Sequence, residues 1–272
     1  LFAFALLSGI LVLAWPQRLL QLCYEDFKSL EAIQRQKTKY DSCQSLKKLG
    51  HHVSLLREGS QTCLVIDGYK SMYVAEGKKG NLRELLFGLT PAYFVKQKKE
   101  ALVLGVGTGI TAGTSARVFQ NVKAVDINPL MFRILPLFSV QNFDLQQAPN
   151  AEFVFNDALV ELARDDQAYE AIINTVTTPL FFSSSKLYTR DFFNLVSEHL
   201  KEGGIYAFWF DCRVGSRGAR IIYETIRQSF RYCAMVYLSR DYVQMICSQS
   251  PLKIYSIPDS VFPQEIREVF ET

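Results

Sequence analysis

Short apolar runs alternate with amphipathic stretches from about residue 100 to residue 250 of this chain. Each apolar run has the length of a buried strand, and apolar residues recur at helical spacing in the stretches between them. The pattern predicts strands at 101–106, 122–127, 152–155, 169–174, 204–210, 232–238 and 242–247. It predicts helices beginning near 111, 129 and 158, and helices spanning about 190–200 and 217–230. Such β-α repetition is typical of a mostly parallel sheet with helices on both faces, and the two successive strands at the end predict one antiparallel edge strand.

The pattern of apolar and polar residues is different before residue 96. Between residues 40 and 74, glycine and aspartate break the apolar runs, and the run at 62–66 is followed by Asp67 and Gly68, which is a strand and hairpin-turn signal. Residues 81–94 then predict a helix that leads into the main domain. We therefore expect a small β-region at 40–95 and a larger α/β domain at 96–272.

The first fifteen residues are apolar apart from Ser8 and Gly9. We interpret residues 1–16 as the end of a transmembrane helix with Trp15 at the interface, because about 20 apolar residues are needed to span a bilayer. The alternative is a buried helix. Residues 17–39 predict a helical connector, and their excess of basic residues favours a cytoplasmic location, in an inner-membrane protein, for the domain that follows.

The composition is that of a folded chain with a sizeable core, since 49% of the 272 residues are hydrophobic and 21% are charged. The formal net charge of +3 is spread without a dense basic block, so the electrostatic footprint of a nucleic-acid binder is missing. The six cysteines form no C-x-x-C pair, so we expect reduced and mostly buried thiols in the cytosol. His51 and His52 lack a third ligand at a recognisable spacing, so no metal site is predicted.

The first strand of the main domain runs into a glycine-rich turn with Gly105, Gly107 and Gly109. Glycines at this point permit a tight turn and let a ligand lie against the backbone, at the positive end of the next helix. The spacing is G-x-G-x-G, so the dinucleotide pattern G-x-G-x-x-G is not met. The turn indicates a nucleoside site, with a purely structural turn as the alternative.

Acidic residues follow the next two strands. Asp126 ends the second strand, where a carboxylate can accept hydrogen bonds from both hydroxyls of a ribose, and its alternative role is to cap the helix beginning near Pro129. Asp157 and Ala158 follow the third strand, and there the carboxylate can accept from an exocyclic adenine amine while it also caps a helix. Further along, Tyr188 and Trp209 are candidates for lining a pocket, although aromatics in such a core more often pack.

In order and spacing, the segments from Leu102 to Phe210 resemble the spermidine synthase family, the aminopropyltransferases, and especially its membrane-fused bacterial branch. The matching segments are L-V-I-D-G at 64–68, V-L-G-V-G-T-G at 103–109, V-D-I-N-P at 125–129, N-D-A at 156–158, Y-E-A-I-I at 169–173, Pro179, L-Y-T-R-D-F-F at 187–193 and L-K-E-G-G at 200–204. With the β-region included, the resemblance extends from about residue 40 to residue 238. It implies a Rossmann-like fold of the S-adenosylmethionine-dependent methyltransferase type, with a mostly parallel seven-stranded sheet.

The resemblance also implies a cofactor, decarboxylated S-adenosylmethionine or S-adenosylmethionine itself. The residues that would bind it are Gly105, Gly107, Gly109, Asp126, Asp157 and Ala158.

The match fails at the amine half of the family's site. Thr175 and Thr178 stand where the family has two aspartates, and a neutral hydroxyl can neither act as general base nor hold a cationic polyamine by charge. Other expected amine contacts are replaced by Ser71, Leu82 and Gly88, and by F-F-S-S-S at 181–185. No catalytic residue is assigned, and Thr175 and Tyr188 remain the candidate substrate-binding residues.

Three functions are compatible with this sequence. The first is a transferase that moves an aminopropyl group from an adenosyl sulfonium donor, and the second is a methyltransferase acting on a less basic acceptor. The third is a non-catalytic nucleoside-sensing domain of a membrane protein. The sequence leaves open the acceptor and whether the chain is a monomer or a homodimer.

Overall fold

The computed structural model describes residues 41–176, 179, 182–211, 214–239, 242–257 and 264–271. The predicted membrane segment at 1–16 and connector at 17–39 lie outside the described residues. The chain divides into two compact units between Glu76 and Gly77. This division falls closer to the N-terminus than the predicted boundary at 95/96, because the helix at 82–89 packs against a helix of the second unit.

The first unit is a four-stranded antiparallel sheet in the order β1-β2-β3-β4. Its strands are β1 (Ser42–Lys48), β2 (His51–Glu58), β3 (Gln61–Ile66) and β4 (Tyr69–Ala75). Asp67 and Gly68 form the predicted hairpin turn between β3 and β4, both with positive φ, at 48° and 85°. The Asp67 carboxylate accepts from the backbone N–H of His52 at 2.6 Å and lies 3.2 Å from Nδ1 of His51, so the histidine pair contacts this turn.

The second unit contains a seven-stranded sheet in the order β10-β11-β9-β8-β5-β6-β7. Its strands are β5 (Glu100–Leu104), β6 (Asn121–Asp126), β7 (Ala151–Phe155), β8 (Tyr169–Asn174), β9 (Leu200–Asp211), β10 (Tyr232–Ser239) and β11 (Tyr242–Ser248). The five strands from β9 to β7 are parallel, as predicted. The antiparallel strand is β11, which lies between β9 and β10 and so is not the predicted edge strand.

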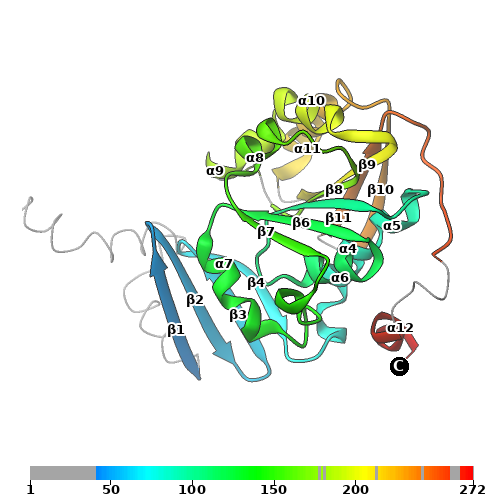
Figure 1. The fold of residues 1–272 in the computed structure, drawn as a ribbon. Helices are drawn as coiled ribbons and strands as arrows, with labels where there is room; N and C mark the ends of the chain where they lie inside the picture. Colours follow the sequence, from blue (N-terminus) through cyan, green and yellow to red (C-terminus); the bar gives the residue numbers. More distant parts are fainter. Residues whose placement is uncertain are drawn as a thin grey trace, which may run out of the picture. The chain divides into compact units, whose positions relative to one another are not determined.

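Helices cover both faces of this sheet (Figure 1). One face carries α4 (Leu82–Leu89), α5 (Pro91–Phe94) and α6 (Ile110–Val118), and the other carries α8 (Ala158–Arg164), α10 (Arg190–Glu198) and α11 (Gly215–Ile226). The remaining helices are α7 (Pro129–Ile134), α9 (Phe182–Ser185) and α12 (Gln264–Glu271), with short 3-10 turns η1 (Lys79–Asn81), η2 (Leu135–Phe138), η3 (Leu145–Gln147) and η4 (Lys186–Tyr188). Among the helices within the described residues, none combines the length and the apolar character needed to cross a membrane.

The core of the second unit explains why α10 forms where the sequence predicts it. Phe192, Phe193 and Val196 recur on one side of this helix and are fully buried against the aromatic side chains of β9, Tyr206 and Phe208. Full burial of such a side chain stabilises a fold by about 1.5–3 kcal/mol. This packing holds α10 against β9.

The prediction that all six cysteines are reduced is wrong. Cys233 of β10 and Cys247 of β11 form a disulfide, since the two residues are direct partners in the antiparallel register, with Cα atoms 4.1 Å apart. A separation of 14 residues gave no signal of this pairing in the sequence. Cys63 is buried and Cys43 is exposed, while Cys23 and Cys212 lie outside the described residues.

Candidate functional site

The glycine turn lies at the carboxyl end of β5, where Gly105, Gly107 and Gly109 all adopt positive φ, at 88°, 54° and 82°. A Cβ at position 105 would lie 2.6 Å from Oγ1 of Thr175, so only glycine fits there. A Cβ at position 107 would meet no atom of the described residues within 4 Å. The turn therefore has one crowded side and one open side, and α6 begins directly behind it.

Asp126 connects the ends of two strands. Oδ2 accepts hydrogen bonds from the backbone N–H of Val106 at 2.7 Å and, less closely, of Gly107 at 3.4 Å. Oδ1 accepts from the N–H of Asn128 at 2.8 Å. These contacts hold the carboxylate against the glycine turn and the start of the segment that leads to α7. Asp126 does not cap α7, which was its alternative role. The side chain of Asn128 caps this helix by accepting from the N–H of Leu130.

Asp157 lies at the end of β7, on the same edge of the sheet as Asp126. It caps α8, as predicted, because Oδ1 accepts from the N–H of Leu159 at 3.0 Å, and Ala158 is the first residue of that helix. Its other oxygen forms an ion pair with Lys186 of η4. The Asp157 side chain is 17% exposed and that of Lys186 is 42% exposed, so the lysine is the outer partner.

Thr175 closes the crowded side of the glycine turn. Its N–H donates to the carbonyl of Leu104 at 2.9 Å, and its hydroxyl lies 2.7 Å from the carbonyl oxygen of Gly105. The single hydroxyl proton is thus committed to the backbone of β5. In this arrangement Thr175 joins β8 to the turn and offers a ligand no charge and no base. Thr178 lies outside the described residues.

Tyr188 lies in η4 and Trp209 lies in β9. The Tyr188 hydroxyl donates to the carbonyl of Val176 at 2.8 Å and its ring is buried, so it holds the loop that follows β8. Trp209 of β9 stacks on Phe87 of α4, with ring centroids 4.0 Å apart. Both aromatic side chains pack in the core, which is the ordinary role of aromatics in such a sheet.

Solved structures similar to this one include spermidine synthases. A spermidine synthase in complex with the transition state analogue AdoDATO gives a TM-score of 0.69 at 15% identity, and the match covers 86% of this chain and 80% of that one. Spermidine synthase from Thermotoga maritima gives 0.67 at 15% identity, with the same coverage. A probable spermidine synthase from Corynebacterium glutamicum gives 0.59 at 18% identity, covering 84% and 85% of the two chains. These likenesses establish the fold.

A curated relative adds a likeness in sequence. Polyamine aminopropyltransferase 2 of Aquifex aeolicus (strain VF5) is 27% identical over 162 residues, which is 57% of this chain. Over this stretch the chain is similar in sequence to a polyamine aminopropyltransferase. It spans 31% of the length of that relative, and no family model matches it.

Leu82 and Gly88, two positions at which amine contacts are expected to be replaced, both lie on α4. Gly88 packs against α6, and a Cβ there would lie 2.5 Å from the carbonyl oxygen of Thr111. Leu82 begins α4 and is 37% exposed. Position 88 is therefore a close packing contact between two helices.

Two charged groups of the second unit, Glu84 and Lys186, were not predicted from the sequence. Burial raises the pKa of Glu84 on α4, against the lowering effect of its own backbone N–H and of Arg83. The partner of Asp157, Lys186, is 29 residues away, and no sequence signal links the two. Asn128 had a signal, since an asparagine before Pro129 is a typical cap.

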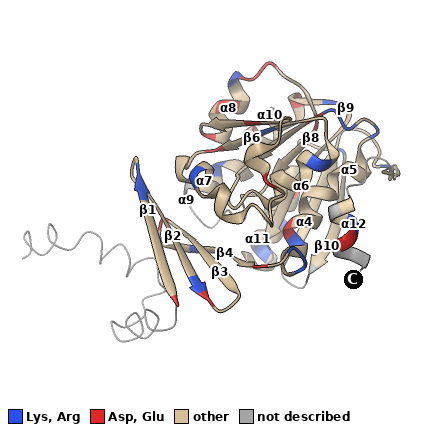
Figure 2. Cartoon of the chain, turned by 60° about the horizontal axis from the view of Figure 1, so that its bottom comes forward, with Lys and Arg blue, Asp and Glu red and all other residues tan. Residues whose placement is uncertain are grey.

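Figure 2 shows short stretches of both charge signs distributed over the elements. Among the described residues, no group of three metal-ligating side chains occurs.

Proposed function

We propose that the second unit is a transferase domain that binds an adenosyl sulfonium donor, decarboxylated S-adenosylmethionine or S-adenosylmethionine, at the carboxyl ends of β5, β6 and β7. The observation that carries this proposal is the geometry at that edge. The glycine turn with its open side follows β5, and the carboxylates of Asp126 and Asp157 lie at the ends of β6 and β7. The sequence likeness to a polyamine aminopropyltransferase supports the same class of ligand. A spermidine synthase of similar fold forms a complex with the transition state analogue AdoDATO. That complex supports the proposal by analogy.

The residues present fit such a nucleoside. The open side of Gly107 gives the backbone room to approach a ligand, Asp126 would accept from ribose hydroxyls, and Asp157 would accept from an adenine amine. When bound, the donor would supply an electrophilic carbon next to a sulfonium. The protein's part is to hold that carbon in line with an acceptor, because positioning converts a bimolecular step into a unimolecular one.

The acceptor is proposed to differ from an ordinary polyamine. A protonated diamine must be held by carboxylates and lose a proton before it attacks, and the Thr175 hydroxyl is already donated to Gly105. This commitment favours a less basic acceptor, which keeps methyl transfer as the second candidate function. A nucleoside-sensing domain is the third, and absence of turnover with intact binding would favour it.

The finer assignment to the membrane-fused branch rests on residues 1–16 as the end of a membrane helix, and it stays a proposal. The cytoplasmic location also stays a proposal. The disulfide between Cys233 and Cys247 counts against a reducing compartment.

The test is calorimetric titration with methylthioadenosine, the product nucleoside of aminopropyl transfer. We expect saturable binding, and Asp126→Ala should weaken it about tenfold or more, because two hydrogen bonds to a charged group are lost. Glu202→Gln, at an exposed position of β9, is the matched control and should bind as the wild type does. Unchanged affinity in Asp126→Ala would exclude Asp126 as the ribose ligand.

A further inference from the structure

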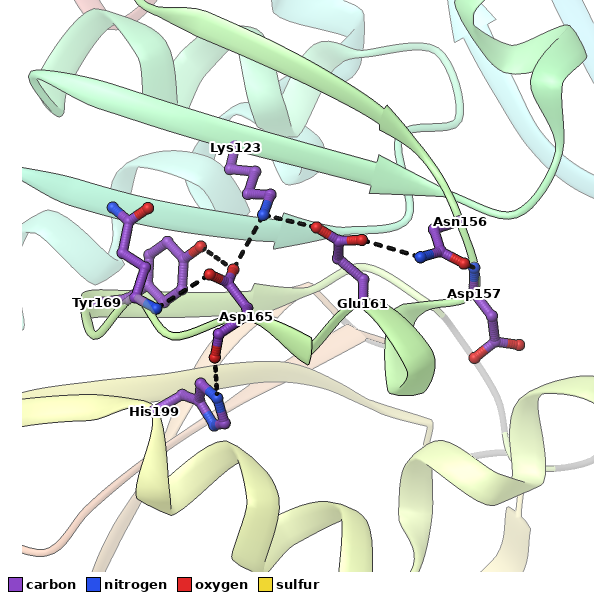
Figure 3. A network of polar contacts seen from close by, with 8 residues as sticks. Lys123, Asn156, Asp157, Glu161, Asp165, Tyr169 and His199 are labelled. Carbon is purple, nitrogen blue, oxygen red and sulfur yellow. Dashed lines mark hydrogen bonds and ion pairs between the residues drawn. The ribbon is translucent and has the colours of Figure 1, made fainter. Parts of the chain in front are cut away.

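A chain of polar side chains runs from the loop that carries Asp157 into the interior of the second unit (Figure 3). The backbone N–H of Asp157 donates to Oδ1 of Asn156 at 2.9 Å, and Nδ2 of Asn156 donates to Oε2 of Glu161 at 2.9 Å. The other carboxylate oxygen of Glu161 lies 2.6 Å from Nζ of Lys123 on β6. Lys123 also contacts Oδ2 of Asp165 at 3.0 Å.

The charges of this network are mostly withheld from water. The side chains of Lys123 and Glu161 are 15% and 14% exposed, and that of Asp165 is 8% exposed. Burial acts against each charge, yet the hydrogen bonds within the group outweigh it, because the pKa of Lys123 is raised and the pKa values of Glu161 and Asp165 are lowered. The network therefore stays charged at neutral pH, and at this exposure solvent and salt screen it little.

The far end of the network is tied to other elements. Tyr169, at the start of β8, donates its hydroxyl to Oδ2 of Asp165, and Nε2 of His199 contacts the carbonyl oxygen of Asp165 at 2.8 Å. The loop after β7 is thus connected, through side chains, to β6, β8 and the end of α10. A loop with such connections keeps one conformation more strictly than a loop held by its own backbone alone.

The Asp157 carboxylate itself stands outside the network. In Figure 3 it points away from Glu161, and its oxygens contact Leu159 and Lys186 instead. The network holds the backbone of residue 157 and leaves the carboxylate at the edge of the sheet. This is the arrangement expected where the supporting side chains fix a ligand-binding group without occupying it.

We propose that Glu161, paired with Lys123, is a positioning residue for base recognition: through Asn156 it fixes the backbone from which Asp157 presents its carboxylate to the amino group of an adenine. This inference rests on the proposed nucleoside site. A hydrogen bond weakens steeply when its angle or distance departs from the optimum. Releasing the loop should therefore reduce the part of the affinity that depends on the amino group, and leave the contacts to the ribose in place.

The experiment compares adenosine with purine riboside, which lacks only the amino group, by calorimetric titration. We expect the wild-type chain to prefer adenosine about tenfold or more, the usual value of a hydrogen bond to a charged group. Glu161→Gln and Asp157→Asn should both reduce this preference to about threefold or less, with the affinity for purine riboside within about twofold of the wild type. Glu152→Gln, at an exposed position of β7 outside the network, is the matched control and should keep the preference.

The outcomes separate the inference from the function on which it rests. If the wild type binds neither nucleoside, the proposed nucleoside site fails. If Asp157→Asn abolishes the preference but Glu161→Gln keeps it, the positioning role is overturned. Equal losses in Glu161→Gln and Glu152→Gln would also overturn it, because they would indicate a general effect of removing a carboxylate and no specific release of the loop. If Glu161→Gln does not fold, Asn156→Ala interrupts the same path without leaving a buried charge, and retained preference in that variant overturns the inference.

Discussion

At the scale of single residues, the molecule keeps a carboxylate in an environment that opposes its charge. The pKa of Glu84 is raised by burial, so its folded-state value lies above its unfolded value. A group shifted in this direction contributes stability at low pH and loses that contribution as the pH rises through the folded pKa. At neutral pH the ionised Glu84 therefore opposes folding.

We predict that Glu84→Gln raises the melting temperature at pH 7 to 8 and has little effect near pH 4, where the wild-type carboxyl is already neutral. Differential scanning calorimetry across this pH range measures the difference. Glu202→Gln serves again as the control, because that side chain is exposed. A melting temperature of Glu84→Gln that runs parallel to the wild type at every pH would contradict the assignment of burial as the cause.

At the scale of elements, α6 depends on close approach to the segment around Asn142. A Cβ on Gly113 would lie 2.0 Å from the carbonyl oxygen of Asn142, which is backbone and cannot turn aside. We predict that Gly113→Ala destabilises the protein by about 1–3 kcal/mol or more, measured by urea unfolding. Gly77→Ala is the matched control, because no described atom lies within 4 Å of its Cβ position, and it should change stability by about 0.5 kcal/mol or less.

The pair β10 and β11 is joined covalently. Replacing Cys233 and Cys247 by serine should cost about 2–4 kcal/mol, since the disulfide closes a loop over a separation of 14 residues and restricts the unfolded chain. Dithiothreitol should lower the melting temperature of the wild type and leave that of the double variant unchanged. Cys43→Ser, at an exposed free thiol, is the control. Equal sensitivity of both proteins to the reductant would mean that the two cysteines are not paired in solution.

The elements themselves were largely predictable from the apolar pattern. The strand expected at 101–106 is β5 at Glu100–Leu104, because a run buried on both faces is continuously apolar. Pairings between distant positions were not predictable. The register that brings Cys233 opposite Cys247, and the loop that brings Lys186 to Asp157, are set by tertiary packing and leave no local signature. The open turn and its two aspartates could be predicted because strand order places consecutive strand ends together.

At the scale of the whole molecule, we propose that the two halves of the candidate site differ. In the proposed nucleoside half, glycines with positive φ and two carboxylates lie at the ends of β5, β6 and β7, and the backbone of Asp157 adjoins a buried ionic network. In the proposed amine half, the Thr175 hydroxyl contacts the backbone just after β5, and Gly88 packs in the contact between α4 and α6. On this proposal, neutral residues and tight packing occupy the amine half.

From this asymmetry we predict that the chain has little or no ordinary spermidine synthase activity, and that one acidic substitution does not restore it. General-base help is typically worth about 10²–10⁴-fold in rate, and Thr175 supplies none. In Thr175→Asp, the new carboxylate would face the carbonyl oxygens of Leu104 and Gly105 with no proton to donate, so repulsion between these oxygen acceptors would oppose the native position. The measurement is release of methylthioadenosine from decarboxylated S-adenosylmethionine and putrescine, with Thr175→Ser as the control that keeps the hydroxyl. Wild-type turnover near one per second, within the ordinary range of enzymes, would show that another group supplies the base.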